Sequence, residues 1–211
     1  MPSKRLLRIG CAAATSMHNI AVFVEDFAHE QVLNILLRRL ADAAGQPVNL
    51  VWGNARNGHG AVVRELKQFL RDIKAGKGSF PDLIIVATDG NCMGYAERRK
   101  QITDLTERVS ARTICAIPDP HIERWLMIDS AAFKQVFGLG CDAPDQKCDR
   151  DRYKSALVQA IRKSGVFPSL GGIEYASDIA KAIDMDRAAI MDNSLRHFIT
   201  DFRAILQEWR S

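Results

Sequence analysis

Short apolar runs alternate with amphipathic stretches over the first two thirds of the chain. The clearest run, residues 83–87, has five consecutive apolar residues and leads directly into Thr88 and Asp89. An uninterrupted run of this length predicts a strand that is buried on both faces, as strands of parallel sheets are. Further strands are expected at residues 21–24, 47–52 and 112–117, and residues 6–11 are a candidate for another short one.

Each of these four strands is followed by a stretch with apolar residues at helical spacing. The corresponding helices are expected at residues 29–44, 61–74, 95–109 and 121–137. Strands and helices that alternate in this way predict a parallel sheet with helices on both faces. The predicted fold class is therefore α/β, with a parallel sheet of about four strands and flanking helices.

The pattern changes after residue 137. Residues 138–152 are rich in Asp, Lys, Gly and Pro, which predicts an exposed excursion. Helices are then expected at residues 151–164, 175–183 and 194–209, with no strand signal among them. We therefore predict an α/β domain over residues 1–140 and a helical C-terminal extension over residues 141–211, packed on the same domain.

Composition narrows the class of protein only slightly. Of the 211 residues, 47% are hydrophobic and 26% are charged, as in ordinary globular proteins, and the net charge of +4 favours polyanionic partners weakly. No apolar run approaches the roughly 20 residues of a membrane span. The five cysteines include no Cys-x-x-Cys pair, which argues against a disulfide framework or a thiolate zinc site and favours a reducing cytoplasm.

Acidic residues follow three of the predicted strands. Glu25 and Asp26 end the first, Asp89 ends the third, and Asp119 ends the fourth, with Glu123 four residues later. Because the carboxyl ends of parallel strands meet at one edge, where ligands bind, we expect these acids to converge. Carboxylate oxygens suit Mg²⁺ or Mn²⁺, and such ions can activate water for phosphodiester cleavage. Capping of the following helix is the alternative role for each acid.

Three segments resemble the motifs of the Toprim domain, the family shared by topoisomerases, primases and OLD-type nucleases. They are VFVEDFAHEQVLNILL, IIVATDGN and AIPDPHIERWLMID, and the last is particularly similar to small stand-alone Toprim-like proteins of bacterial defence and mobile loci. The resemblance covers roughly residues 20–137. It implies that Glu25 is a general acid/base or a metal ligand, and that Asp89 is the first acid of an Asp-x-Asp pair.

The chain departs from that pattern at the second acid, which is Asn91 here. An amide oxygen can still bind Mg²⁺, but more weakly unless Asp119 or Glu123 compensates. The predicted catalytic residues are Glu25, Asp89 and Asp119. The predicted metal ligands are Glu25, Asp89, Asn91, Asp119 and Glu123.

Basic residues near these acids are candidates for contacts with nucleic acid. Arg56 and His59 lie in the glycine-rich segment GNARNGHG, which also fits a plain flexible loop. Arg98, Arg99 and Lys100 lie a turn or so beyond Asp89, where a solvated helix face is the alternative. His29 and His121 stand near the acids as well and are candidate proton donors.

Three functions remain open. The leading one is a metal-dependent nuclease of Toprim type that acts on DNA or RNA in bacterial defence, with Mg²⁺ or Mn²⁺ as cofactor. The second, favoured by Asn91, is a catalytically impaired regulatory or effector subunit that binds an ATPase partner. The third is a receiver-like phosphoacceptor. The sequence argues against it, because it shows no fifth strand ending in Lys. The implied partners are nucleic acid, an ATPase or a second copy of the chain, and not a membrane.

Overall fold

The computed structural model describes residues 17–53, 58–109, 111–149 and 151–210. Within them, four strands form one parallel sheet in the order β2-β1-β3-β4. The strands are β1 (His18–Val24), β2 (Val48–Trp52), β3 (Leu83–Ala87) and β4 (Thr113–Ala116). The predicted α/β class and parallel sheet are confirmed, and the candidate strand at residues 6–11 lies outside the described residues.

The central strand β3 shows why its apolar run is unbroken. All five of its residues are fully buried. Leu83, Ile85 and Ala87 belong to one hydrophobic cluster, whereas Ile84 and Val86 belong to a second cluster on the opposite face. Side chains alternate between the two faces of a strand, so a strand covered on both faces needs an apolar residue at every position.

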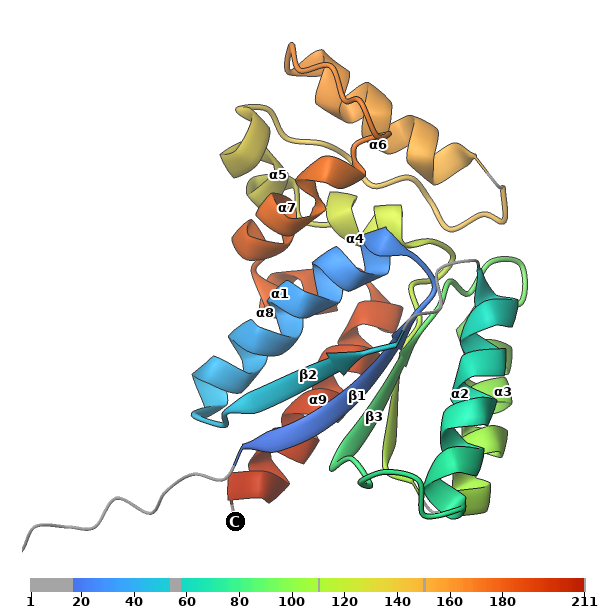
Figure 1. Ribbon diagram of the computed structural model, residues 1–211. Helices are drawn as coiled ribbons and strands as arrows, with labels where there is room; N and C mark the ends of the chain where they lie inside the picture. The colour runs from blue at the N-terminus through green and yellow to red at the C-terminus, as the bar shows by residue number, and fades with distance from the viewer. Residues whose placement is uncertain (1–16, 54–57, 110, 150, 211) are drawn as a thin grey trace, which may run out of the picture.

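Helices cover the two faces as the alternation predicts (Figure 1). Helices α1 (Phe27–Ala44) and α9 (Asn193–Arg210) contribute to the first cluster, and α2 (His59–Lys74) and α3 (Gly94–Thr106) contribute to the second. A short 3-10 turn, η1 (Glu107–Val109), follows α3. Helix α1 begins where the Asp26 carboxylate accepts a hydrogen bond from the His29 N–H at 3.0 Å, and it ends at Gly45, whose φ of 67° is left-handed.

The prediction of a single helix over residues 121–137 is wrong. The chain forms α4 (Ile122–Met127) and α5 (Ser130–Phe137), separated at Asp129. The Asp129 carboxylate caps α5 by accepting the Ala132 N–H at 3.2 Å, and it binds the Arg187 guanidinium through Nε at 3.0 Å and Nη2 at 2.7 Å. Apolar spacing continues across the break, so the periodicity does not reveal it.

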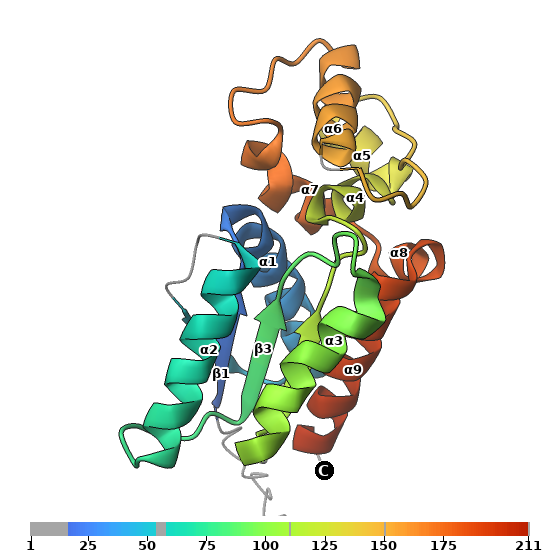
Figure 2. The same ribbon diagram turned by 90° about the vertical axis from the view of Figure 1, so that its right-hand side faces the viewer.

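The C-terminal helices contribute residues to the first hydrophobic cluster. They are α6 (Arg152–Lys163), the 3-10 turn η2 (Ile173–Tyr175), α7 (Ala176–Ala182), α8 (Met185–Met191) and α9. The sequence analysis missed α8, whose N-cap is Asp184. Leu157, Ile179 and Phe198 share the first hydrophobic cluster with the sheet. In Figure 2 the strands point toward α4, α5, α6 and α7, which stand beyond the carboxyl edge of the sheet.

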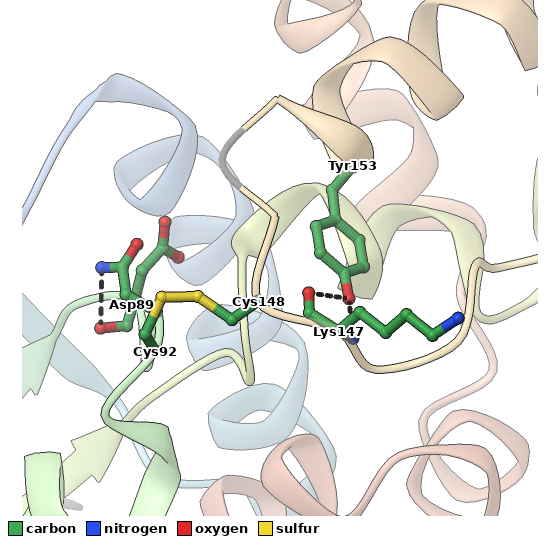
Figure 3. Close-up of a disulfide and its surroundings, with 6 residues drawn as sticks. Asp89, Cys92, Lys147, Cys148 and Tyr153 are labelled. Carbon is green, nitrogen blue, oxygen red and sulfur yellow. Dashed lines mark hydrogen bonds between the residues drawn. A yellow bond between two sulfur atoms is a disulfide. The ribbon is translucent and has the colours of Figure 1, made fainter.

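One disulfide corrects the prediction from cysteine spacing. Cys92, in the loop that follows β3, is bonded to Cys148, with 5.1 Å between the two Cα atoms (Figure 3). The two residues are 56 positions apart, so no local motif marks the pair. Among the described residues, no helix has both the length and the apolar character that crossing a membrane requires.

Candidate functional site

The register of β1 and β3 brings Glu25 and Asp89 together. Val24 lies opposite Ala87, and the Glu25 N–H donates to the Ala87 carbonyl at 3.0 Å. Beyond the strands, Glu25 Oε2 accepts hydrogen bonds from the Asp89 N–H at 3.0 Å and from the Thr88 hydroxyl. Because the chain leaves β1 for β2 on one side and returns to β3 on the other, this junction is the topological switch point where ligands of open α/β sheets bind.

Asp89 is the most tightly held acid at this edge. The residue is only 9% exposed, and its Oδ2 is 2.8 Å from Nδ1 of His121. Oδ1 accepts the Ile122 N–H, in the first turn of α4, at 2.9 Å and lies 3.2 Å from Nε2 of His29. Both carboxylate oxygens therefore face N–H donors of the protein.

His29 extends this arrangement into a row of alternating carboxylates and imidazoles. The ring is completely buried, with Nδ1 2.8 Å from Asp26 Oδ1 and Nε2 facing Asp89. The row therefore runs Asp26, His29, Asp89, His121. Two imidazoles on either side of a buried carboxylate compensate its charge, which burial alone would make unfavourable.

The pKa values follow from this row. Burial disfavours the charged form of Asp89, but the charges and hydrogen bonds of His29 and His121 outweigh it and lower the pKa of the Asp89 carboxyl to about 2. Burial likewise opposes protonation of His29, yet Asp89 and Asp26 raise its pKa well above 6.5. The hydrogen bond to Asp89 raises the pKa of His121 against the effect of burial. Both shifts favour the protonated imidazole, and the shift is the larger one for His29.

A second hydrogen-bonded row reaches Glu25 from α2. Nδ1 of His59, the first residue of α2, is 3.1 Å from the Thr88 hydroxyl, which in turn donates to Glu25 Oε2. A hydroxyl has a single proton, so Thr88 accepts from His59 while it donates to Glu25. Burial, together with the charge of Arg98, lowers the pKa of His59. The pKa of His59 is therefore shifted in the opposite direction to that of His121.

Glu123 lies beside the first row. It is half-buried in the first turn of α4. Burial raises the pKa of its carboxyl, and the negative charges of Asp89 and Asp26 raise it further, against the charge of His121. Glu123 is therefore part of the same electrostatic group as Asp89.

The Asp119 side chain does not cap the helix that follows it, α4, but binds the first turn of the preceding helix, α3. Its Oδ2 accepts the Tyr95 N–H, in the first turn of α3, at 3.2 Å, and its own N–H donates to Ser194 Oγ at 3.2 Å. Asn91 shapes the neighbouring turn: its φ is 49°, its N–H donates to the Pro120 carbonyl at 2.9 Å, and its side-chain amide donates to the Asp89 carbonyl at 3.4 Å. Asn adopts this left-handed conformation more readily than most residues.

The predicted phosphate-binding residues separate into two groups. Arg98 is buried and points inward, where Nε donates to the Asp89 carbonyl at 3.2 Å and Nη1 donates to Gln101 Oε1 at 3.1 Å. Arg99 and Lys100 are exposed and face acids of the protein, Asp201 at 3.8 Å and Asp104 at 2.7 Å respectively. Arg56 lies outside the described residues.

As arranged, the predicted ligands do not fit a preformed site for Mg²⁺ or Mn²⁺. Asp89 and Asp119 already accept hydrogen bonds from protein N–H groups, and the imidazoles of His29 and His121 occupy the space beside the Asp89 oxygens where a metal ion would need to approach. In the part of the chain that the structure describes, no three His, Cys, Asp or Glu side chains are grouped to hold a metal ion. We therefore derive no chemical step through a metal.

The sequence analysis did not include Thr88, His29 or His121 among its assigned site residues. His29 is three residues after Asp26, a spacing that places it in the first turn of the same helix, facing its cap. His121 directly precedes α4, whose first N–H binds Asp89. The sequence analysis named both histidines as candidate proton donors without assigning them to the site, and it missed Thr88.

Comparison with protein-family models, with curated proteins and with solved structures found no match for this chain.

Proposed function

We propose that the chain is a hydrolase that cleaves phosphodiester bonds of nucleic acid at the carboxyl edge of its sheet. The observation that carries the proposal is the Asp89–His121 pair. Nδ1 of His121 is held by Asp89 at 2.8 Å, which leaves Nε2 as the nitrogen that can exchange a proton with a substrate. A carboxylate that orients an imidazole in this way is a recurrent acid-base unit of hydrolytic enzymes.

The pKa shifts favour distinct roles for the groups at the site. His121, whose pKa is raised by its hydrogen bond to Asp89, is suited to protonate a leaving oxygen. Glu25 is suited to accept a proton from the attacking water. Its Oε2 is held by Thr88 and Asp89, while Oε1 lies toward Gly58, where an added Cβ would stand 3.9 Å away. Asp89 positions His121 and stabilises its charge, and His29 in turn holds Asp89.

The substrate class and cellular setting rest on the sequence. The resemblance to Toprim domains and the net charge of +4 support nucleic acid as substrate, and bacterial defence as the role. We place the protein in the cytoplasm, where a disulfide is usually reversible rather than structural. Dependence on Mg²⁺ or Mn²⁺ stays a prediction of the Toprim resemblance, to be tested beside the metal-free reaction.

A substrate panel with matched histidine variants tests the proposal. Plasmid, single-stranded DNA and tRNA are each incubated with Mg²⁺, Mn²⁺ or EDTA. His121→Gln is expected to lower the cleavage rate by about 100-fold or more, because a general acid contributes roughly that factor. His197→Gln is the control, since His197 is an exposed residue of α9 whose ring stacks on Tyr95. Equal activity of His121→Gln and wild type would contradict the assignment.

A second function is favoured by the contacts that the Asp89 carboxylate already makes within the protein. Its two oxygens already face three protein N–H donors, and Asn91 stands where a second acid is expected, so the fold also suits a catalytically impaired subunit that binds an ATPase partner. Affinity purification of the tagged chain distinguishes the two. A co-purifying ATPase in stoichiometric amount, together with no cleavage of any substrate by the isolated chain, would favour the subunit over the hydrolase.

A further inference from the structure

The Cys92–Cys148 disulfide connects the loop of the candidate site to a segment distant in sequence. Cys92 follows Asp89 by three residues, and Cys148 lies in residues 142–149, which we term the strap. Figure 3 shows the bond running from the Asp89 loop to the strap, with Tyr153 on the far side. Both cysteines are exposed, so a thiol in solution can reach their sulfur atoms.

The remaining described cysteines differ from this pair. Cys115, on β4, and Cys141 are free thiols. Burial raises the pKa of each to about 12, so almost none of either is thiolate at neutral pH. Thiol–disulfide exchange needs a thiolate, and the redox-sensitive pair of the described chain is therefore Cys92 and Cys148.

The two segments that the disulfide joins are held unequally by other bonds. The Asp89 loop is anchored by backbone hydrogen bonds from Gly90 N–H to the Pro118 carbonyl at 2.7 Å and from Asn91 N–H to the Pro120 carbonyl at 2.9 Å. The strap has no helix or strand and is held mainly by side chains, which bind its carbonyls and one N–H. Cleavage of the disulfide should release the strap and leave the loop in place.

The strap is also tied to the ring beside His121. The Tyr153 hydroxyl accepts the Lys147 N–H at 2.7 Å and lies 2.8 Å from the Asp145 carbonyl. The Tyr153 ring centroid is 5.5 Å from that of His121. The position of the strap is therefore coupled, through Tyr153, to the surroundings of the His121 ring.

We propose that the Cys92–Cys148 disulfide is a thiol-reducible tether that holds the strap against the candidate site, and that its reduction opens access to His121. The reductant is a dithiol. One of its thiolates attacks an exposed sulfur of the pair, which forms a mixed disulfide with that cysteine and releases the other cysteine. The second thiolate of the reductant then attacks the mixed disulfide and releases the remaining cysteine. Two electrons pass from the reductant to the cysteine pair. Cys92 and Cys148 take up two protons and become thiols, and the reductant becomes a disulfide. The inference concerns access to the site and does not depend on the reaction performed there.

Hydrogen–deuterium exchange of the full chain, with and without dithiothreitol, tests the tether. Reduction is expected to accelerate exchange at the Lys147 N–H, which is hydrogen-bonded to the Tyr153 hydroxyl, by about tenfold or more, because a segment that loses its cross-link opens locally. The amides of β3 should not respond. The double variant Cys92→Ser/Cys148→Ser should exchange fast without reductant and ignore it. Cys141→Ser, which keeps the disulfide, should respond as wild type does.

Chemical modification tests access to the site. The rate at which diethylpyrocarbonate modifies His121 is expected to be about tenfold higher in the Cys92→Ser/Cys148→Ser variant than in oxidised wild type, while the rate at exposed His197 stays equal. The proposal would be overturned if reduction did not change hydrogen exchange in the strap. It would also be overturned if His121 were modified at equal rates in the variant and in oxidised wild type. Free thiols at both cysteines in protein prepared in air would overturn it as well. Neither readout requires enzyme activity, so failure of the hydrolase proposal would leave this test intact.

Discussion

Two strand ends that look alike in sequence differ in structure. Asp89 lies shortly after the end of β3, and Asp119 lies shortly after the end of β4. Each acid follows a buried apolar run. Asp89 is nearly buried and lies between the imidazoles of His29 and His121. Asp119 is half-buried and caps α3 through the Tyr95 N–H.

The difference comes from the neighbours of each strand. β3 has β1 on one side, and the chain that leaves β1 enters α1 with Asp26 and His29 in its first turn. β4 is the edge strand, and the Asp119 side chain after it accepts a hydrogen bond from the start of α3. An acid at a strand end thus becomes a candidate reactive group when a second element supplies cations, and a helix cap when it supplies only N–H groups.

The largest expected effect is the difference in stability between variants that lack Asp89 and variants that lack Asp119. Asp89→Ala would leave the completely buried His29 facing Asp26 alone, and breaking a buried pair typically costs about 3–5 kcal/mol. Asp119→Ala removes a helix cap and should cost about 1 kcal/mol. Urea denaturation of both variants measures the free energies of unfolding. Similar losses for the two variants would remove the distinction between the strand ends.

The pH dependence of stability should show the same asymmetry. The pKa of Asp89 is lowered from 3.8 to about 2, so its contribution is present above pH 3.8 and is lost as the pH falls toward about 2. The pKa of His29 is raised, so its contribution is present below 6.5 and is lost as the pH rises through the raised value. The stability difference between wild type and Asp89→Asn should therefore be largest between pH 3.8 and 6.5.

The Asp89 component of that difference is about 2 kcal/mol, from a shift of nearly two pKa units. Thermal and urea unfolding at a series of pH values would measure it. Asp119→Asn, the same change at the other strand end, is the matched control. A stability difference for Asp89→Asn that is flat from acid to neutral pH would contradict the pairing.

A smaller effect is expected at Thr88, which connects β3 to Glu25. Thr88→Val keeps the shape of the side chain but removes the hydroxyl between His59 and Glu25, at a cost of about 1–2 kcal/mol for polar groups left without a partner. Thr88→Ser keeps the hydroxyl and should lose less. Equal stability of Thr88→Val and wild type in chemical denaturation would show that this hydrogen-bonded row contributes nothing.

The smallest effect concerns the exposed cations of α3. Lys100→Ala removes an exposed ion pair with Asp104 and should leave the free energy of unfolding almost unchanged. If Lys100 also contacts a phosphate, the slope of log affinity against log salt falls by about 1 in a nucleic-acid binding assay. Arg112→Ala, which removes an exposed pair with Glu208, is the control away from the site.

The fold was more predictable than the site because its signals are local. The apolar run of β3 and the helical spacing after each strand are visible in short windows, and both predict the parallel sheet. The break at Asp129 was missed because it depends on Arg187, which is 58 positions away. The Cys92–Cys148 bond escaped prediction for the same reason, since only the folded chain brings the strap to the Asp89 loop.

Within the site, adjacent strand ends were predictable but side-chain partners were not. That Glu25 and Asp89 meet follows from two parallel strands that end in acids, if the strands are neighbours. That Asp89 faces His29 and His121, whereas Asp119 faces Tyr95, depends on how α1, α3 and α4 enter the edge. Arg98 likewise looked like a solvent-facing cation, but its helix directs it inward to the Asp89 carbonyl.

NMR titration of the histidine side chains, in wild type and Asp89→Asn, tests the pairing at Asp89 most directly. Between about pH 5 and pH 9, where imidazoles titrate, the midpoints of His29 and His121 should lie above 6.5 and that of His59 below it. Asp89→Asn should lower the midpoints of His29 and His121, because their shared carboxylate is gone, and should affect His59 least. A midpoint of His121 at or below 6.5 in wild type, or one that Asp89→Asn does not move, would contradict the account.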